Sequence, residues 1–148
     1  MSGPRQAMEA ALKRAVDAHL RPKGFAGSLP HFRRRAPDRI DLVSFQFHSA
    51  GGSFVVEVAG CDPDGYTTGW GKQIQPSKVT AHDIPMPRPR LGPGFPTNDH
   101  WFVFGPRSYE AGSADVRAAA HYESIAAEVI RLIDVQAEPF WQSAPSRS

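Results

Sequence analysis

Two alternating runs decide the fold of this chain: IDLVSFQFH at residues 40–48 and FVVEVA at residues 54–59, with the glycine pair Gly51-Gly52 between them. Side chains two residues apart in a strand share a face, and hydrophobic residues recur at this spacing in both runs. Glycines supply the tight turn that joins antiparallel strands. We therefore predict an antiparallel hairpin. One face of its first strand carries Val43, Phe45 and Phe47, and the other carries Ser44, Gln46 and His48.

The flanking segments extend this hairpin into a larger sheet with a helix before it. Apolar residues spaced three and four apart predict an amphipathic helix over Arg5–Leu20, which Pro22 and Gly24 end. His31–Arg35 is predicted to be a short strand. Trp101–Phe104 is predicted to be a further strand, and its apolar residues on both faces place it centrally or beneath a helix.

A second helix is predicted near the C-terminus. Ser113 is a typical N-cap, and Pro139 is expected to stop the helix. Phe140 and Trp141 are then expected to fold back as an aromatic lid. The apolar stripe of this helix consists of Tyr122, Ile125, Ala126, Val129, Leu132, Ile133 and Gln136. Residues 143–148 are expected to form a disordered tail.

The segment Asp62–Asp99 differs in composition from the rest of the chain. Five glycines and seven prolines occur among its 38 residues, and a structureless loop of that length is unusual in a compact domain. Either it contains short strands, with Ser77–Ile84 the best candidate, or it crosses the surface as a functional excursion. The alternating prolines at 85, 87 and 89 favour an extended, stiff strap.

These elements together predict an α+β fold of two layers, with both helices on one face of an antiparallel sheet and a long loop rich in Pro and Gly. The length of 148 residues suits one domain, which we place at residues 1–142. The single cysteine, Cys61, excludes an internal disulfide framework and a cysteine-based zinc site. No apolar run is long enough to span a membrane and no secretory leader is evident, so we expect a cytoplasmic protein.

The charge is unevenly distributed along the chain. Residues 1–40 contain nine basic and three acidic residues, whereas residues 41–148 contain eight and twelve. The basic part includes the triplet Arg33-Arg34-Arg35, and Phe32 shares a strand face with Arg34, a pairing that also suits a base-stacking sheet. Mutual neutralisation of the two parts on folding is the simpler interpretation, so a nucleic-acid partner is not expected.

Motifs for phosphate loops, dinucleotide folds, serine nucleophile elbows and helical zinc sites are absent from the sequence. Three of the six histidines, His48, His82 and His100, could converge only if the long loop folded back on the sheet. No histidine pair has the spacing that places two metal ligands together. We expect no metal, no cofactor and no set of catalytic residues.

Arg88 and Arg90 are the first candidates for a binding site. Prolines flank them, so two guanidinium groups are held at a set spacing that suits carboxylate or phosphate. The alternative is that they clamp the protein's own acids, such as Asp62, Asp64 or Asp83. Both interpretations stay open at this point.

The remaining candidates are Gln46, His48, Trp70 and His100. Gln46 and His48 lie on the polar face of their strand, which is either plain solvent surface or the floor of a pocket roofed by the Trp70 loop. His48 or His100 would supply an acid or base if the protein were an enzyme.

Several runs of sequence resemble the bacterial family described as domain of unknown function 4304. These runs are LRPKGF at 20–25, FRR at 32–34, LVSFQ at 42–46, FVVEV at 54–58, RPRLG at 88–92, WF at 101–102 and EPFW at 138–141. The similarity covers residues 8–142. It implies an α+β fold without a known activity, and it carries over no catalytic residues.

Three functions are compatible with these observations. The leading one is a non-enzymatic binding or interaction protein, including the toxin-neutralising kind, which an exposed aromatic patch around Trp70, Phe95 or Trp141 would favour. The second is an enzyme or binder that acts on an anionic small molecule through Arg88 and Arg90. The third is nucleic-acid binding through the basic N-terminal part. The sequence leaves the oligomeric state open.

Overall fold

The structure, a computed structural model, describes residues 3–143. Its elements in chain order are α1 (Pro4–Leu20), the 3-10 turn η1 (Arg21–Lys23), β1 (Ala26–Ser28), β2 (His31–Ala36), β3 (Arg39–Phe47), β4 (Ser53–Cys61), β5 (Tyr66–Thr67), β6 (Gln73–Ile74), the 3-10 turn η2 (Ala81–Asp83), β7 (Phe102–Val103), α2 (Ala119–Leu132), the π-helical turn η3 (Ile133–Ala137) and α3 (Glu138–Ser143). No helix in this part of the chain is long and apolar enough to cross a membrane.

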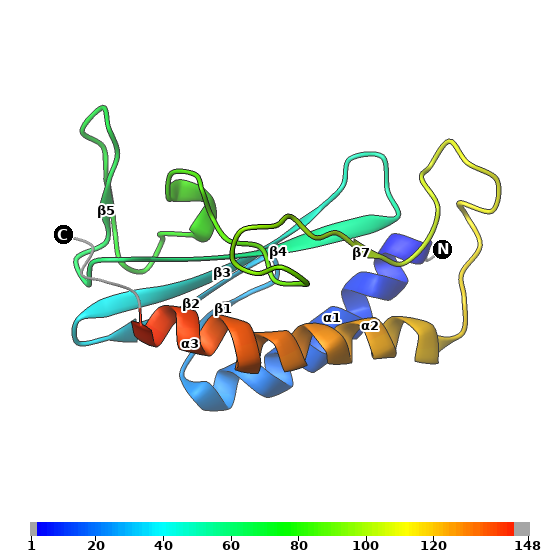
Figure 1. The fold of residues 1–148 in the computed structure, drawn as a ribbon, viewed down its shortest axis with the longest axis horizontal. Coiled ribbons are helices and arrows are strands. Elements are labelled where there is room, and N and C mark those ends of the chain that lie inside the picture. Colours follow the sequence, from blue (N-terminus) through cyan, green and yellow to red (C-terminus); the bar gives the residue numbers. More distant parts are fainter. Residues whose placement is uncertain (1–2, 144–148) are drawn as a thin grey trace.

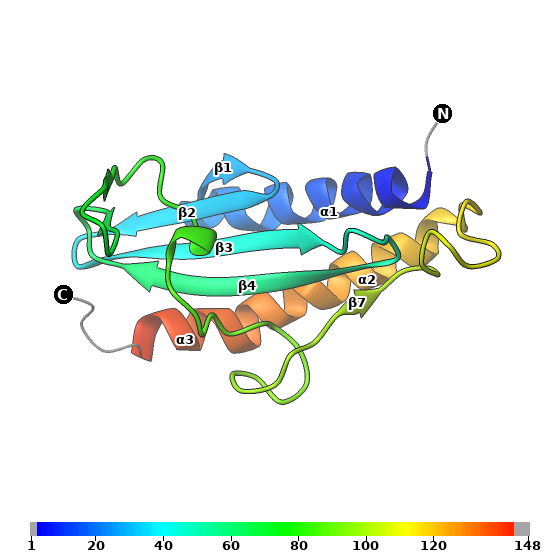
Figure 2. The same ribbon diagram turned by 90° about the horizontal axis from the view of Figure 1, so that it is seen from above.

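The predicted hairpin forms the centre of a five-stranded antiparallel sheet in the order β1-β2-β3-β4-β7 (Figure 2). β3 and β4 pair from Ile40 opposite Cys61 to Phe47 opposite Phe54. Upstream, the predicted first helix is confirmed as α1, and Gly24 ends the turn after it with a φ of 95°, a conformation that favours glycine.

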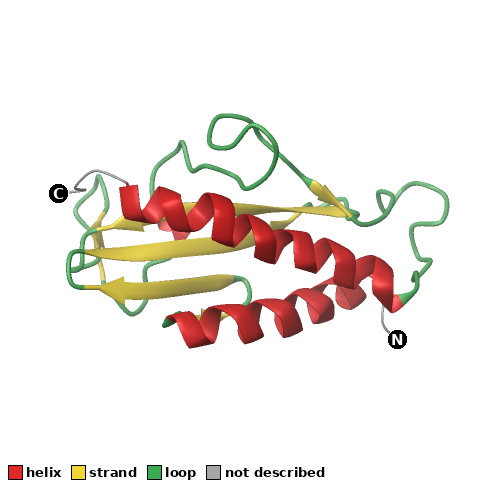
Figure 3. Ribbon diagram, turned by 60° about the horizontal axis from the view of Figure 1, so that its bottom comes forward, coloured by secondary structure: helices red, strands yellow, loops and turns green. Residues whose placement is uncertain are grey.

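Both long helices cover one face of the sheet and run side by side in the same direction (Figures 1 and 3). The hydrophobic face predicted for residues 43–47 points into this layer, where Val43 and Phe45 are buried. The main core is therefore a two-layer α+β arrangement, as predicted. Its helical contribution includes Met8, Leu12, Val16, Leu20, Tyr122, Ala126, Val129, Leu132 and Ile133.

Residues 62–83 lie over the opposite face of the sheet, above it in Figure 1. The rest of the segment 62–99 passes the edge of β4 to the helix side, where Leu91 joins the main core and Gly92 hydrogen-bonds to Gln136. Val79 and Ala81 from this excursion pack against Leu42 and Cys61 in a second, smaller hydrophobic cluster. The predicted strand at Ser77–Ile84 is wrong, because Val79 leads into the 3-10 turn η2 instead. The strands that the segment does contain are the two short strands of the β5–β6 hairpin.

The strand predicted at Trp101–Phe104 exists, and of its two predicted positions, central or beneath a helix, only the second is confirmed. Phe102 and Phe104 are buried in the main core, where the Phe104 ring lies 6.5 Å from the ring of Tyr122 on α2. β7 contains only two residues and lies at the edge of the sheet beyond β4, where the exposed fraction of Val103 is 66%. Apolar composition alone suggested burial on both faces. The edge position leaves one side chain of the pair in solvent.

The C-terminal helix differs from the prediction at both ends. It begins at Ala119 rather than near Ser113, whose hydroxyl donates to the Ser108 carbonyl. Pro139 does not stop the helix: α2, η3 and α3 follow one another without a break, and the wider π-helical turn η3 directly before Pro139 accommodates a residue that lacks an N–H. Trp141 is therefore no lid: it is fully buried and its Nε1 donates to the Ala59 carbonyl at 2.9 Å. Of the predicted tail, residues 144–148 lie outside the described part.

Candidate binding site

A row of polar side chains crosses the face of the sheet opposite the helices. The strand registers place His31 opposite Ser44 and Ser44 opposite Glu57, and a β-bridge places Glu57 opposite Arg90. Directly opposed positions on adjacent strands share a face, so these four side chains form one continuous row. The excursion covers this row.

Glu57 is the centre of the row and has no exposed surface. Arg88 Nε donates to its Oε1 and Arg90 Nε to its Oε2, each at 2.9 Å, and Arg88 Nη1 donates to the Ile84 carbonyl at 2.7 Å. This geometry matches the internal-clamp interpretation of the two arginines. The acid that they clamp is Glu57 rather than any of the three aspartates that the sequence suggested.

The clamp holds the strap, residues 84–91, alongside β4. The Val58 amide donates to the Pro89 carbonyl, and the Leu91 amide donates to the Val56 carbonyl, both at 2.9 Å. The strap thus takes over from β7 as the neighbour of β4. The backbone hydrogen bonds between the strap and β4 end at Val58, although Gly60 beyond it is still buried.

A cavity of about 750 Å³ lies beside this last part of β4. Along an antiparallel strand, the backbone N–H and C=O groups of alternate residues point to the same side. Val56 and Val58 form their backbone hydrogen bonds with the strap, so the N–H and C=O groups of Gly60 also point to the strap side. No hydrogen-bond partner on that side is provided by any residue within 3–143. The cavity is lined by Val58, Ala59, Gly60, Cys61, Asp62, Asp64, Gly65, Tyr66, Thr67, Gln73, Ile84, Pro87, Pro89 and Phe140.

The lining of this cavity combines apolar surface with polar and acidic groups. Ile84, Pro87 and Phe140 contribute hydrophobic surface, whereas Asp62 and Asp64 contribute carboxylates. Neither aspartate forms an ion pair within the described residues, and no Lys or Arg lines the cavity. The local charge therefore favours a cationic group over an anionic one.

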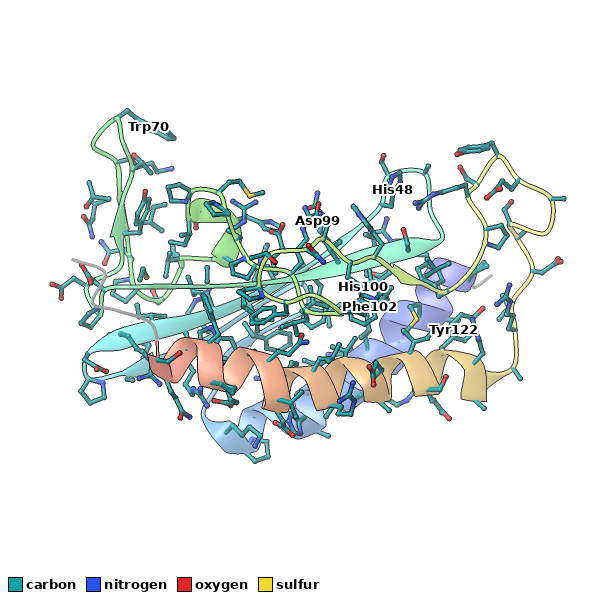
Figure 4. The ribbon with its side chains drawn as sticks, in the orientation of Figure 1. His48, Trp70, Asp99, His100, Phe102 and Tyr122 are labelled. Carbon is teal, nitrogen blue, oxygen red and sulfur yellow. The ribbon has the colours of Figure 1, made fainter. Side chains whose placement is uncertain are left out.

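Trp70 stands at the tip of the β5–β6 hairpin, and 82% of it is exposed. Figure 4 shows it at the opposite end of the molecule from His48, so the Trp70 loop does not roof the Gln46 and His48 face. Instead, the base of the hairpin, through Tyr66, Thr67 and Gln73, forms one wall of the cavity. Of the three aromatic residues proposed for an exposed patch, Trp141 is buried and Phe95 is partly buried in the main core.

The other candidate residues lie apart from the cavity. Gln46 is exposed, and His48 Nδ1 accepts a hydrogen bond from the Ala50 amide while its ring packs edge-on against Trp101. His100 packs edge-on against Phe102. No three His, Cys, Asp or Glu side chains in the described part are placed to hold a metal ion.

One chemically suggestive pair was not evident from the sequence. Ser44 Oγ lies 2.7 Å from His31 Nδ1, and His82 Nε2 lies 3.5 Å from Glu57 Oε1, with the two imidazole rings in edge contact. A Ser–His pair is the arrangement of an activated nucleophile. However, Ser44 has no exposed surface, so this hydroxyl cannot reach a substrate in this structure. Only the strand register reveals the pair, which is why the spacing in sequence did not indicate it.

The basic N-terminal part is largely paired with acids. Arg34 donates to Asp41 and, through both Nη atoms, to Glu138, and Lys23 lies 3.8 Å from Asp134. Phe32 is buried, so the base-stacking interpretation of its pairing with Arg34 is wrong. Mutual neutralisation between the two parts of the chain accounts for these contacts.

Comparison with known proteins identifies a family and assigns it no activity. Neither the curated proteins nor the solved structures include a match to the chain. The family model described as "Domain of unknown function (DUF4304)" matches residues 16–143, most of the chain. The chain therefore belongs to this family.

Proposed function

We propose that this protein is a non-enzymatic binding protein whose cavity beside β4 takes an extended peptide segment with a Lys or Arg side chain. The observation that carries the proposal is the cavity itself, in which Gly60 presents an unpaired strand edge next to two carboxylates without cationic partners. This proposal develops the binding-protein interpretation of the sequence. Whether the partner is a toxin stays a prediction.

The open edge supports an extended ligand. A free strand edge presents backbone donors and acceptors to an incoming chain, and peptides bind many domains by adding a strand at such an edge. β7 and the strap already occupy the edge of β4 up to Val58. A ligand strand at Gly60 would continue the same row of backbone hydrogen bonds.

The chemistry of the walls supports a basic side chain on that ligand. Lys and Arg combine a long aliphatic stem with a charged end. The stem fits the apolar surface of Ile84, Pro87 and Phe140, and the charged end fits Asp62 and Asp64. An anionic small molecule would face the same carboxylates with the wrong charge, and the arginines expected to hold it are engaged by Glu57.

Trp70 supports a partner larger than the cavity. Tryptophan is enriched among the residues that dominate binding energy at protein interfaces. Its exposed position on the hairpin that walls the cavity lets one partner contact both the cavity and the indole.

The test uses the isotopically labelled full chain and two pools of capped apolar pentapeptides, one with a central Lys or Arg and one with a central Glu. Backbone amide shifts are followed by NMR. We expect the basic pool to shift Gly60, Tyr66 and Thr67, and the acidic pool to leave them unchanged. Asp62→Asn plus Asp64→Asn should weaken binding by about tenfold or more, because hydrogen bonds to charged groups contribute about 1.5 to 3 kcal/mol.

The matched control is Asp38→Asn plus Asp115→Asn, which removes the same charge from exposed positions away from the cavity. It should bind the basic pool like the unmodified chain. Trp70→Ala should weaken capture of a larger partner without changing the melting temperature. Equal binding of both pools, or amide shifts that map away from the cavity, would reject the proposal.

A further inference from the structure

Arg33 differs in its partners from four nearby arginines. Arg34, Arg39, Arg88 and Arg90 each contact carboxylates, whereas Arg33 forms no ion pair with any described residue. Its Nε donates to the Val79 carbonyl at 3.0 Å, so one edge of the guanidinium is anchored by the excursion. Both Nη atoms retain donor capacity beyond this bond.

Arg33 lines a small pocket together with Arg35. The pocket measures about 250 Å³, and Gly24, Ala26 and Ser77 complete its lining. Arg33 and Arg35 are two positions apart on β2, so both side chains lie on the face opposite the helices. No described residue forms an ion pair with Arg35 either. Two arginines and a serine therefore line one concave place that no described acidic residue lines.

We propose that this pocket binds a compact oxyanion, a phosphate group or a carboxylate, through the guanidinium groups of Arg33 and Arg35 and the hydroxyl of Ser77. A guanidinium presents its N–H donors in a planar fork that matches both kinds of oxyanion. The bond from Arg33 to Val79 orients that fork before any ligand arrives, which reduces the entropy lost on binding.

The electrostatics of Arg33 agree with this assignment. Burial lowers the pKa of its guanidinium, and the charge of Asp83 opposes this effect. A half-buried cation without a paired carboxylate is costly to keep charged. A bound anion would supply the missing charge.

The oxyanion pocket is independent of the peptide cavity. The two share no lining residue, although segments of residues 62–99 contribute to both. Failure of one proposal therefore leaves the other intact, and each has its own variants.

The test is titration of the full chain with sodium phosphate, and separately with sodium acetate, by calorimetry at constant ionic strength. Saturable binding in the millimolar range or tighter is expected for at least one of these probes, and the probe that binds identifies the oxyanion. Arg33→Gln and Arg35→Gln should each weaken binding by about tenfold or more. Arg33→Lys should also weaken it, because lysine lacks the fork.

Two controls keep the result specific. Arg131→Gln removes the same charge from an exposed helix position, and it should bind the probe like the unmodified chain. Arg35 is exposed, so Arg35→Gln tests the pocket even if loss of the Arg33 bond to Val79 disturbs the fold. Absence of saturable binding for both probes, or an equal loss in Arg131→Gln, would overturn the proposal. Binding of a single-stranded polynucleotide but of neither small probe would overturn it too, in favour of an extended nucleic-acid contact.

Discussion

The Arg88 guanidinium lies 2.9 Å from the carboxylate of Glu57, at a position where that carboxylate has no exposed surface. The second carboxylate oxygen accepts from Arg90, so one buried acid joins β4 to two points of the strap. A buried charge is tolerated when its partners satisfy it, and removal of one side of such a group is strongly destabilising. The strap is therefore part of the folded core rather than a loose surface loop.

Glu57→Gln is expected to lower the free energy of unfolding by about 3 kcal/mol or more, because it removes the buried counter-charge that Arg88 and Arg90 share and leaves Arg90 only the exposed carboxylate of Asp99. Urea denaturation measures the change. Glu123→Gln, at an exposed position of α2, is the matched control and should change stability by less than about 0.5 kcal/mol. A similar small effect at Glu57 would contradict the clamp.

The double variant Arg88→Ala plus Arg90→Ala is expected to lower the melting temperature by several degrees. The double substitution leaves the buried carboxylate of Glu57 without the two guanidinium groups that donate to it. Differential scanning calorimetry provides the measurement. If the melting temperature stayed unchanged while capture of an anionic ligand was lost, the arginines would instead belong to a ligand site.

Phe45→Ala is expected to cost about 3 to 5 kcal/mol, because Phe45 packs at the centre of the main core between the sheet and the helices. Urea melts measure the change. Val103→Ala, at the exposed edge strand, serves as the control with little expected effect. A loss below about 1 kcal/mol at Phe45 would be inconsistent with its burial.

Acid is expected to destabilise the fold through His31. Burial lowers the pKa of His31 below its ordinary value of 6.5, and His82 and Arg33 lower it further, while Asp83 acts in the opposite direction. The unfolded chain then binds this proton at a higher pH than the folded protein does, so protonation favours unfolding. The contribution of His31 to stability is complete above pH 6.5 and is lost as the pH falls through 6.5 toward the lowered pKa.

The measurement is the free energy of unfolding from urea melts at a series of pH values from 8 down to about 5, a range that spans histidine titration. His31→Gln should show a flatter decline than the unmodified chain. His121→Gln removes an imidazole from α2 and should retain the steeper decline. Identical slopes for all three proteins would show that His31 is not responsible.

Local patterns were sufficient where the determining contacts are close in sequence. The alternation in residues 40–48 and 54–59 correctly predicted the hairpin and the buried face that carries Val43 and Phe45. The helical spacing of residues 5–20 likewise predicted α1. In both cases hydrophobic burial acts on one face of a regular element, and the period of that element is visible in the sequence.

Local signals were misleading where a distant contact outweighed them. Pro139 is a typical helix stop, yet the helical path continues past it because Trp141 gains a buried position and a hydrogen bond to Ala59. The apolar run at residues 101–104 suggested a strand that lies centrally or beneath a helix. It lies beneath α2 but at the sheet edge, because the strap occupies the rest of that edge of β4.

The amino-acid pattern thus determined the sheet, the helices and which faces they bury, since those depend on periodicity within each element. Only the tertiary structure decided that Arg88 and Arg90 meet Glu57, that His31 meets Ser44, and that the edge of β4 opens into a cavity at Gly60. Each of these depends on strand register and on the path of residues 62–99. Such pairings join segments far apart in the chain, and no local period encodes them.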